Sequence, residues 1–278
     1  MILKIKCFMF FRPLVITVLF ITSFALYGAK KEEVVKPISP WSFNLTAYVW
    51  LPGVNGNFSA GPYTKSIDSS FIDIAGKLSN FPVAFMGHFE AHYDRLGFYM
   101  DGNYIGLDFK PKNVHGVNLG LSTELGIMDY GVMYRLFGPT ATERVNGWNK
   151  KERSYLFDVY TGGRSIFLGN QINASLGPYS ANATSSKTFT VPTVGGRVIV
   201  DLTSKWFILV DGNIGGFGLN NVNFTSSGLG ALGYRTSLTD IPLSVEAGYK
   251  ALNIDIDKSV AAANVTLNGP FLGVTGYW

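Results

Sequence analysis

The residues with the clearest chemical potential are His88, Glu90 and His92, which alternate along one short segment of the sequence. In a β-strand, side chains at i, i+2 and i+4 point to the same face, about 6.5–7 Å apart at each step. Neighbours in this set could share a proton or a water molecule. A metal with bonds near ~2 Å would need ligands drawn closer and help from another strand. We therefore predict a hydrogen-bonded cluster with Arg164 or Arg197, and no metal, cofactor or catalytic site.

Other charged residues fall on the polar faces of neighbouring alternating segments. If each strand turns its apolar face to lipid, the polar face points into the lumen of a barrel. Asp129 would join this face if a bulge near Gly126 shifted the phase of its strand. The predicted lumen network is His88, Glu90, His92, Asp101, Glu124, Asp158, Arg164, Arg197, Asp211, Glu246 and Lys250, with Tyr160 beside it.

Two kinds of lumen are consistent with this network. Buried charges in a narrow barrel must be paired and hydrogen-bonded, which predicts a sealed, charge-paired interior. A conducting lumen is the alternative, and its seven acids, counting Asp129, against three Arg or Lys predict a mild preference for cations. A third alternative is a lipid-modifying enzyme, in which His115 and Ser122, with Glu124, would have to meet within hydrogen-bond reach. Spacing alone does not bring these residues together, so we expect no enzymatic activity.

The elements that position these residues are alternating segments separated by turn residues. The clearest runs from Trp41 to Trp50, with apolar side chains at odd positions and polar or amphipathic ones at even positions. Such blocks of about ten residues are typical of a transmembrane β-barrel. The further predicted strands cover residues 81–93, 98–109, 117–136, 155–168, 191–202, 206–217, 224–235, 243–254 and 265–278.

The fold class we predict is all-β, a transmembrane antiparallel barrel of ten strands, with eight or twelve left open by residues 54–69 and 171–176. A secreted β-sandwich is the alternative, but its solvated face should carry many Lys, Glu and Ser. Residues 94–97, 203–205 and 236–241 form short periplasmic turns in this scheme. Outer loops are predicted at 52–80, 110–116, 169–190, 219–223 and 255–264, the first holding a hairpin (56–69) and a helical turn (71–78). Residues 138–154 are an unusually long periplasmic connection.

The first 29 residues predict a cleaved export signal, because Lys4 and Lys6 precede an apolar run from Pro13 to Leu26. Residues 30–40 then form a periplasmic leader and 41–278 the outer-membrane barrel. Removal of the signal takes away the sole cysteine, Cys7, and leaves 20 Lys and Arg against 19 Asp and Glu. This balance excludes a nucleic-acid partner on charge grounds, and the chain needs no disulfide.

Several motifs occur together in this sequence: residues 47–56 (AYVWLPGVNG), 85–92 (FMGHFEAH), 215–218 (GGFG) and 269–273 (GPFLG). In this combination the chain resembles a family of uncharacterised Gram-negative outer-membrane β-barrel proteins, over residues 41–278. Gly276 departs from the family's pattern, in which closing strands carry an aromatic or large apolar residue at that position. The resemblance implies a fold and an outer-membrane location, with lipid and the barrel-insertion machinery as partners.

We thus expect a small pore or passive transport protein with a narrow, charge-paired lumen, passing small solutes. The alternative is a structural or surface-interaction barrel with a sealed lumen, in which the loops at 52–80 and 169–190 carry the function.

Overall fold

The computed structural model describes residues 39–60, 63–70, 86–109, 118–148, 154–176, 179–238, 240–258 and 261–278. The predicted export signal, nearly all of the leader and the helical turn at 71–78 lie outside these residues. The described part is almost entirely β-structure: β1 (Trp41–Trp50), β2 (Gly53–Ala60), β3 (Tyr63–Ser69), β4 (Met86–Tyr93), β5 (Leu96–Phe109), β6 (Asn118–Phe137), α3 (Ala141–Asn146), β7 (Tyr155–Leu176), β8 (Tyr179–Asp201), β9 (Trp206–Leu219), β10 (Val222–Leu238), β11 (Ile241–Lys258) and β12 (Ala261–Tyr277).

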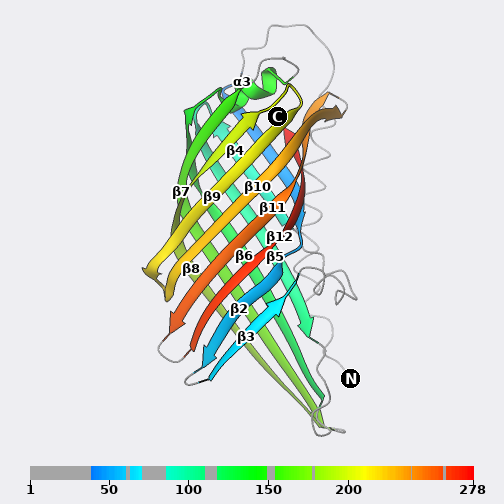
Figure 1. Cartoon of the computed structure of the whole chain (residues 1–278), viewed down its shortest axis with the longest axis vertical. Coiled ribbons are helices and arrows are strands. Elements are labelled where there is room, and N and C mark those ends of the chain that lie inside the picture. The colour runs from blue at the N-terminus through cyan, green and yellow to red at the C-terminus, as the bar shows by residue number, and fades with distance from the viewer. Residues whose placement is uncertain are drawn as a thin grey trace. The chain divides into compact units, whose positions relative to one another are not determined.

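Ten of these strands close into an antiparallel barrel (Figure 1). β1 pairs with β4, each strand from β4 to β12 pairs with the next, and β12 pairs back with β1. The ring closes where Phe43 and Trp278 exchange two backbone hydrogen bonds, each 2.9 Å long. The predicted ten-stranded barrel is confirmed.

The structure has twelve strands in total but only ten positions in the barrel wall, because the first wall strand is interrupted. β12 pairs with β1 through Phe271–Tyr277 and with β2 through Ala261–Asn268, so β1 and β2 occupy one position in the wall. Pro52 lies at the break, where its missing N–H interrupts the ladder. Gly269 faces this break, because a side chain there would meet the Leu51 carbonyl oxygen at 1.9 Å. β3 pairs with β2 and forms the predicted hairpin at the edge.

The two faces of the wall differ as a membrane barrel requires. In β1 the odd residues Trp41, Phe43, Leu45 and Val49 are exposed, whereas the even residues Ser42, Thr46, Tyr48 and Trp50 are buried in the lumen. Aromatic side chains gather on the outward face at the α3 end: Trp41, Tyr93, Tyr134, Phe137, Tyr155, Trp206 and Trp278. Such a belt is typical of a membrane interface. No helix among the described residues is long and apolar enough to cross a membrane.

Gly276, the departure from the family pattern, lies under an aromatic ring. A Cβ at this position would stand 2.7 Å from the indole of Trp278, which covers it. The large side chain that this position lacks is therefore supplied from two residues further along the strand.

Two predicted outer loops are strands instead. β7 and β8 stay paired from Gly169↔Ser186 to Leu176↔Tyr179, and β11 and β12 stay paired as far as Lys258↔Ala261. The loop prediction at 169–190 was wrong because its second half, residues 182–188 (NATSSKT), is rich in Ser, Thr and Asn and has no large apolar side chain. Alternation disappears where neither face meets lipid, although the backbone can remain paired.

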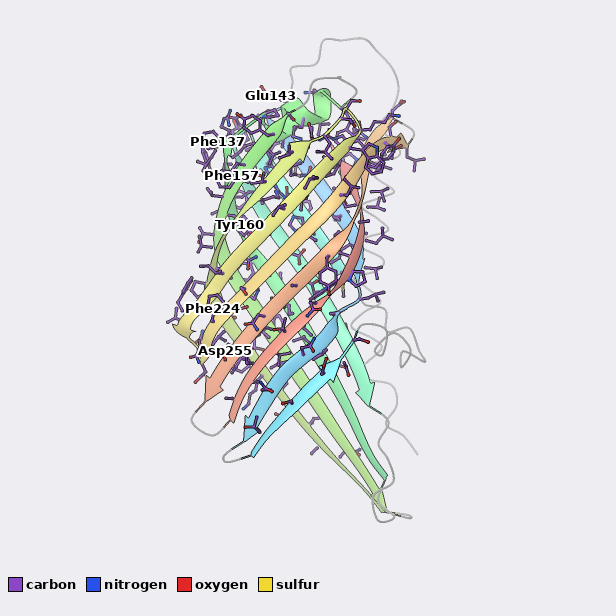
Figure 2. The ribbon with its side chains drawn as sticks, viewed as in Figure 1. Phe137, Glu143, Phe157, Tyr160, Phe224 and Asp255 are labelled. Carbon is purple, nitrogen blue, oxygen red and sulfur yellow. The ribbon has the colours of Figure 1, made fainter. Side chains whose placement is uncertain are left out.

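The long connection between β6 and β7 folds into α3. Thr140 caps its N-terminus by accepting from the Glu143 amide, and the Glu143 carboxylate accepts from the Thr140 amide. These hydrogen bonds lower the pKa of Glu143. Ala141 is buried, and Thr142 Oγ1 donates to the Pro40 carbonyl at 3.3 Å, so the helix lies at the end of the barrel where β1 begins (Figures 1 and 2).

Candidate functional site in the barrel lumen

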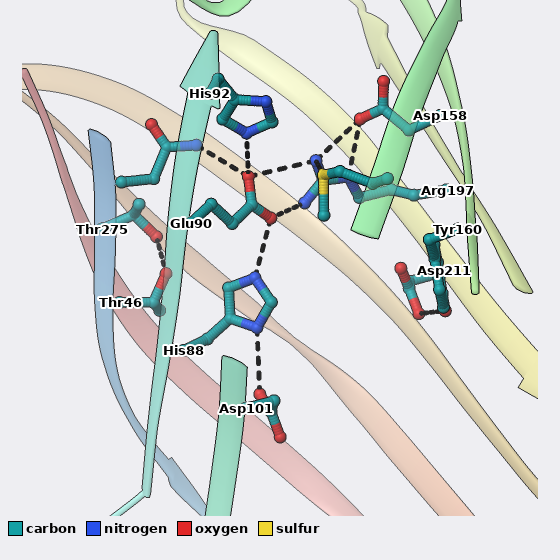
Figure 3. A network of polar contacts seen from close by, with 12 residues as sticks. Thr46, His88, Glu90, His92, Asp101, Asp158, Tyr160, Arg197, Asp211 and Thr275 are labelled. Carbon is teal, nitrogen blue, oxygen red and sulfur yellow. Dashed lines mark hydrogen bonds and ion pairs between the residues drawn. The ribbon is translucent and has the colours of Figure 1, made fainter. Parts of the chain in front are cut away.

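Glu90 on β4 is the centre of a hydrogen-bond network inside the barrel (Figure 3). His88 Nε2 lies 2.7 Å from Glu90 Oε1, and His92 Nε2 lies 2.7 Å from Oε2. Asn44 Nδ2 donates to Oε2 at 2.9 Å, and the guanidinium of Arg197 donates to both oxygens. Glu90 is only 1% exposed, and these four side chains satisfy its carboxylate, which offsets the cost of burying it.

The network continues from Arg197 to a second buried carboxylate. Arg197 Nη2 donates to Asp158 Oδ2 at 2.7 Å, and Arg135 Nε donates to Asp158 Oδ1 at 2.8 Å. Arg135 Nη1 then reaches the Pro139 carbonyl at 2.8 Å, just before α3. Negative and positive side chains thus alternate from Glu90 toward the helix, so each charge lies next to an opposite one.

A second branch leaves Glu90 through His88. His88 Nδ1 lies 3.3 Å from Asp101 Oδ2, and Lys250 Nζ lies 3.3 Å from Asp101 Oδ1. Tyr48 donates its hydroxyl to both oxygens of Asp101, at 2.9 and 3.0 Å. The Lys250 ammonium also lies 4.9 Å from the centre of the Tyr48 ring, which adds a cation–π contact.

Arg164 on β7 is the centre of a further cluster, beside Asp129 in the β6–β7 ladder. It is fully buried and donates to both oxygens of Asp129, at 2.7 and 2.9 Å. It also donates to Thr225 Oγ1 at 2.7 Å and to Asn213 Oδ1 at 2.9 Å. The planar guanidinium fits this set, because it offers several donors in fixed directions.

Asp129 reaches the lumen without the bulge that the sequence analysis required. The pairing of β6 with β5 and β7 runs without a register shift through Gly126, and the shift in β6 lies between Arg135 and Phe137. Odd residues of β6 therefore face inward. Glu124, an even residue, is exposed on the outer face, so its assignment to the lumen network was wrong.

Asp211 and Glu246 lie in the lumen but form no ion pair with any described residue. Asp211 accepts from the Tyr160 hydroxyl at 2.7 Å. Glu246 accepts from the hydroxyls of Ser244 and Thr275, the latter at 3.0 Å. These two carboxylates differ from the other predicted acids that lie in the lumen, each of which has a cationic partner.

Sequence reasoning missed a third group of charges, beneath α3. Arg235 pairs with Asp201, which also accepts from Ser154 Oγ at 2.7 Å. Arg144 on α3 lies 3.9 Å from Asp201 Oδ1. Burial, together with the positive charge of Arg235, lowers the pKa of Arg144 to about 10. Asp201 could have been found, because it lies four residues after Arg197 on the same strand face.

Trp148, just after α3, connects the α3 segment to the barrel strands. Its indole Nε1 donates to the Thr236 carbonyl at 2.8 Å, and its ring lies 4.7 Å from that of Tyr277. The guanidinium of Arg235 lies 5.5 Å from the same indole ring. The described part of this connection before β7, residues 138–148, thus lies over the end of the lumen.

A cavity of about 160 Å³ lies in the lumen beside this cover. Arg144 and Trp148 line it at the α3 end, and Tyr48 and Phe271 line it at the other. On this side of the lumen, the described residues include seven carboxylates (Glu90, Asp101, Asp129, Asp158, Asp201, Asp211 and Glu246) and six Arg or Lys side chains (Arg135, Arg144, Arg164, Arg197, Arg235 and Lys250). Carboxylates therefore outnumber Arg and Lys by one in the structure, whereas they outnumbered them by four in the set predicted from the sequence.

An apolar layer fills the lumen beyond the cavity. Its buried members come from eight of the ten barrel positions, so the layer extends across the interior. They are Tyr48, Trp50, Met86, Ile127, Ile166, Phe189, Val191, Val222, Leu252, Ile254, Leu267 and Phe271. A barrel of this size is narrow enough for side chains to fill.

No family model matches this chain, and neither does any curated protein. Solved structures with a similar course of strands include Ail, the attachment invasion locus protein of Yersinia pestis, in complex with the heparin analogue sucrose octasulfate, at 9% identity and TM-score 0.35. That match covers 86% of this chain and 98% of Ail. The outer membrane protease OmpT from Escherichia coli matches at 6% identity and TM-score 0.44, over 88% of this chain and 99% of OmpT. A Pseudomonas aeruginosa FadL homologue matches at 9% identity and TM-score 0.28, over 86% of this chain and 90% of that protein.

The three TM-scores are all below 0.5, and at such low similarity these neighbours say nothing about the activity of this chain. The resemblance to an uncharacterised outer-membrane family therefore stays a prediction.

The described residues hold no group of three or more His, Cys, Asp or Glu arranged to bind a metal ion. His88, Glu90 and His92 instead use their ring nitrogens and carboxylate oxygens on one another. The hydrolase pairing considered as an alternative involves His115, which lies outside the described residues.

Proposed function

We propose that this chain is a bacterial outer-membrane barrel whose lumen is closed to passive flow, and whose projecting hairpins make its contacts outside the membrane. The observation that carries this proposal is the apolar layer. Twelve buried apolar side chains from eight barrel positions pack together inside the lumen, which supports a closed interior. The α3 segment covers the same lumen at its other end.

The outer face of the wall and the N-terminal sequence support this proposed location. Exposed apolar side chains cover the wall and aromatic ones gather at the α3 end, as expected for a barrel in lipid. The export signal predicted for residues 1–29 supplies the route. We further propose outer-membrane lipid and the barrel-insertion machinery as partners of this chain.

The β7–β8 hairpin is the surface best placed to meet partners outside the membrane. β8 pairs with β9 only over Thr193–Asp201, so its first 14 residues, roughly 45 Å of strand, extend beyond that pairing. The described side chains from Asn182 to Thr188 are exposed and mostly polar. We place this end outside the cell and the α3 end, with its short turns, in the periplasm.

Planar-bilayer recordings test the closed lumen. The purified barrel, inserted from detergent and shown to be folded by its resistance to protease, should give no steady conductance. A stable, ohmic conductance in the unmodified protein would contradict the proposal. It would support a narrow pore instead, whose cation preference would follow from the unpaired Asp211 and Glu246. We assign the chain no enzymatic role.

A further inference from the structure

We propose that the cavity beside α3 binds a small organic cation that carries N–H donors, a primary ammonium or a guanidinium. This site is independent of whether the lumen conducts. The geometry that points to it is a cavity in which positive charges are paired and two negative charges are not.

The charge balance selects a cation. Arg135, Arg144, Arg197 and Lys250 line the cavity, and each has a carboxylate partner. Asp211 and Glu246 line it too and meet only hydroxyl donors. An ionised carboxylate away from water is costly unless a positive charge or further donors reach it. A ligand that enters this cavity with a positive charge supplies both.

The hydrogen-bonding inventory selects a ligand with N–H groups. Asn44 Oδ1 is the buried side-chain atom without a hydrogen-bond partner among the described residues, and Asn44 lines the same cavity. It is an acceptor, as are the carboxylates of Asp211 and Glu246. Tyr99 and Tyr160 line the same cavity, and aromatic faces attract cations.

Size limits the ligand further. A cavity of about 160 Å³ corresponds to roughly five water molecules at their share of liquid volume. An alkylammonium with a short chain, or guanidinium itself, fits this space, whereas a peptide or a lipid does not. Trp148 and Arg144 lie between the cavity and the α3 end, so the cover formed by this segment controls entry from that side.

The experiment uses the full barrel folded in detergent micelles and two probes, n-propylammonium and guanidinium, at millimolar concentration. Isothermal titration calorimetry and the thermal unfolding midpoint should both show saturable binding, because a ligand that binds the folded state stabilises it. Tetramethylammonium, which has no N–H donor, and propionate, which is an anion, should bind at least tenfold more weakly.

Two variants locate the site. Asp211→Asn and Glu246→Gln should each weaken propylammonium binding at least tenfold, whereas Glu124→Gln, which changes an exposed carboxylate on the outer face of β6, should leave it unchanged. If a lumen variant fails to fold, the comparison of the probe ions on the unmodified barrel still decides the test. Absence of saturable binding of either probe, or equal binding of tetramethylammonium, would overturn the proposal, as would unchanged affinity in both lumen variants.

Discussion

Glu90 and Arg197 meet inside the lumen although 107 residues separate them in the sequence. Glu90 extends from β4 and Arg197 from β8, and β5, β6 and β7 lie between these strands in the wall. The ion pair therefore spans the interior instead of joining neighbouring strands. Figure 3 shows it as the contact that connects the histidines of β4 with Asp158.

This pair should contribute strongly to stability. Arg197→Ala leaves Glu90 and Asp158 short of a buried positive charge, and removing one partner of a buried pair costs about 3–5 kcal/mol. Urea unfolding of the barrel in detergent, followed by tryptophan fluorescence, measures the loss. The double variant Glu90→Gln with Arg197→Met should recover part of this lost stability, because neither replacement side chain carries a charge.

The matched control for that measurement is Lys187→Ala, which removes an exposed charge on the β7–β8 hairpin. Its effect should stay within about 0.5 kcal/mol. An Arg197→Ala barrel as stable as the Lys187→Ala barrel would show that the lumen network adds nothing to stability.

The apolar layer should control passage through the lumen. Trp50 and Phe271 face each other across the β1–β12 ladder and point inward. Replacing both with Ala should produce a measurable conductance, at a cost in stability of about 3–5 kcal/mol for each residue. The control is the adjacent pair, Val49→Ala with Leu272→Ala, whose side chains point outward. Identical conductance in the two double variants would rule out the layer as the barrier.

Two glycines of β10 should differ in their response to the same substitution. A Cβ at Gly233 would come within 2.1 Å of the ring of Phe207, which is 2% exposed and has little room to move. Gly230, three residues earlier, has no atom within 4 Å of that position. Gly233→Ala should lower the free energy of unfolding by about 1–3 kcal/mol, whereas Gly230→Ala should be neutral. Equal unfolding midpoints for the two variants would disprove the ring-over-glycine contact.

The seam between β1 and β12 gives a test of barrel closure. Trp278 donates its backbone N–H to Phe43 and accepts another hydrogen bond from it. Trp278→Pro removes the indole and the donor together, while Trp278→Ala removes the indole alone. In heat-induced unfolding, the proline variant should be less stable than the alanine variant by about 1 kcal/mol, which is the net value of one hydrogen bond. If the alanine variant loses as much, the side chain accounts for the whole effect.

Much of the wall could be predicted because strand alternation is a local property. Trp41 to Trp50 shows its apolar and polar faces directly, and β4 shows them again around Glu90. The prediction failed for β6. Asp129 stands at an odd position and Glu124 at an even one, and the sequence did not show which of the two faces the lumen. The backbone register chose, by keeping the odd residues inward along the whole strand.

The sequence by itself determined the ten alternating strand positions, the inward side of most of them and the charged residues available to the lumen. Only the tertiary structure decided which charges meet, because contacts such as Glu90 with Arg197 depend on how far each strand is staggered around the closed ring. It also decided that residues 138–148 cover one end, through Trp148 and Arg144, and that apolar side chains from eight barrel positions form one buried cluster. Period-two patterns specify a face, and closure of the ring specifies which residues share a level within it.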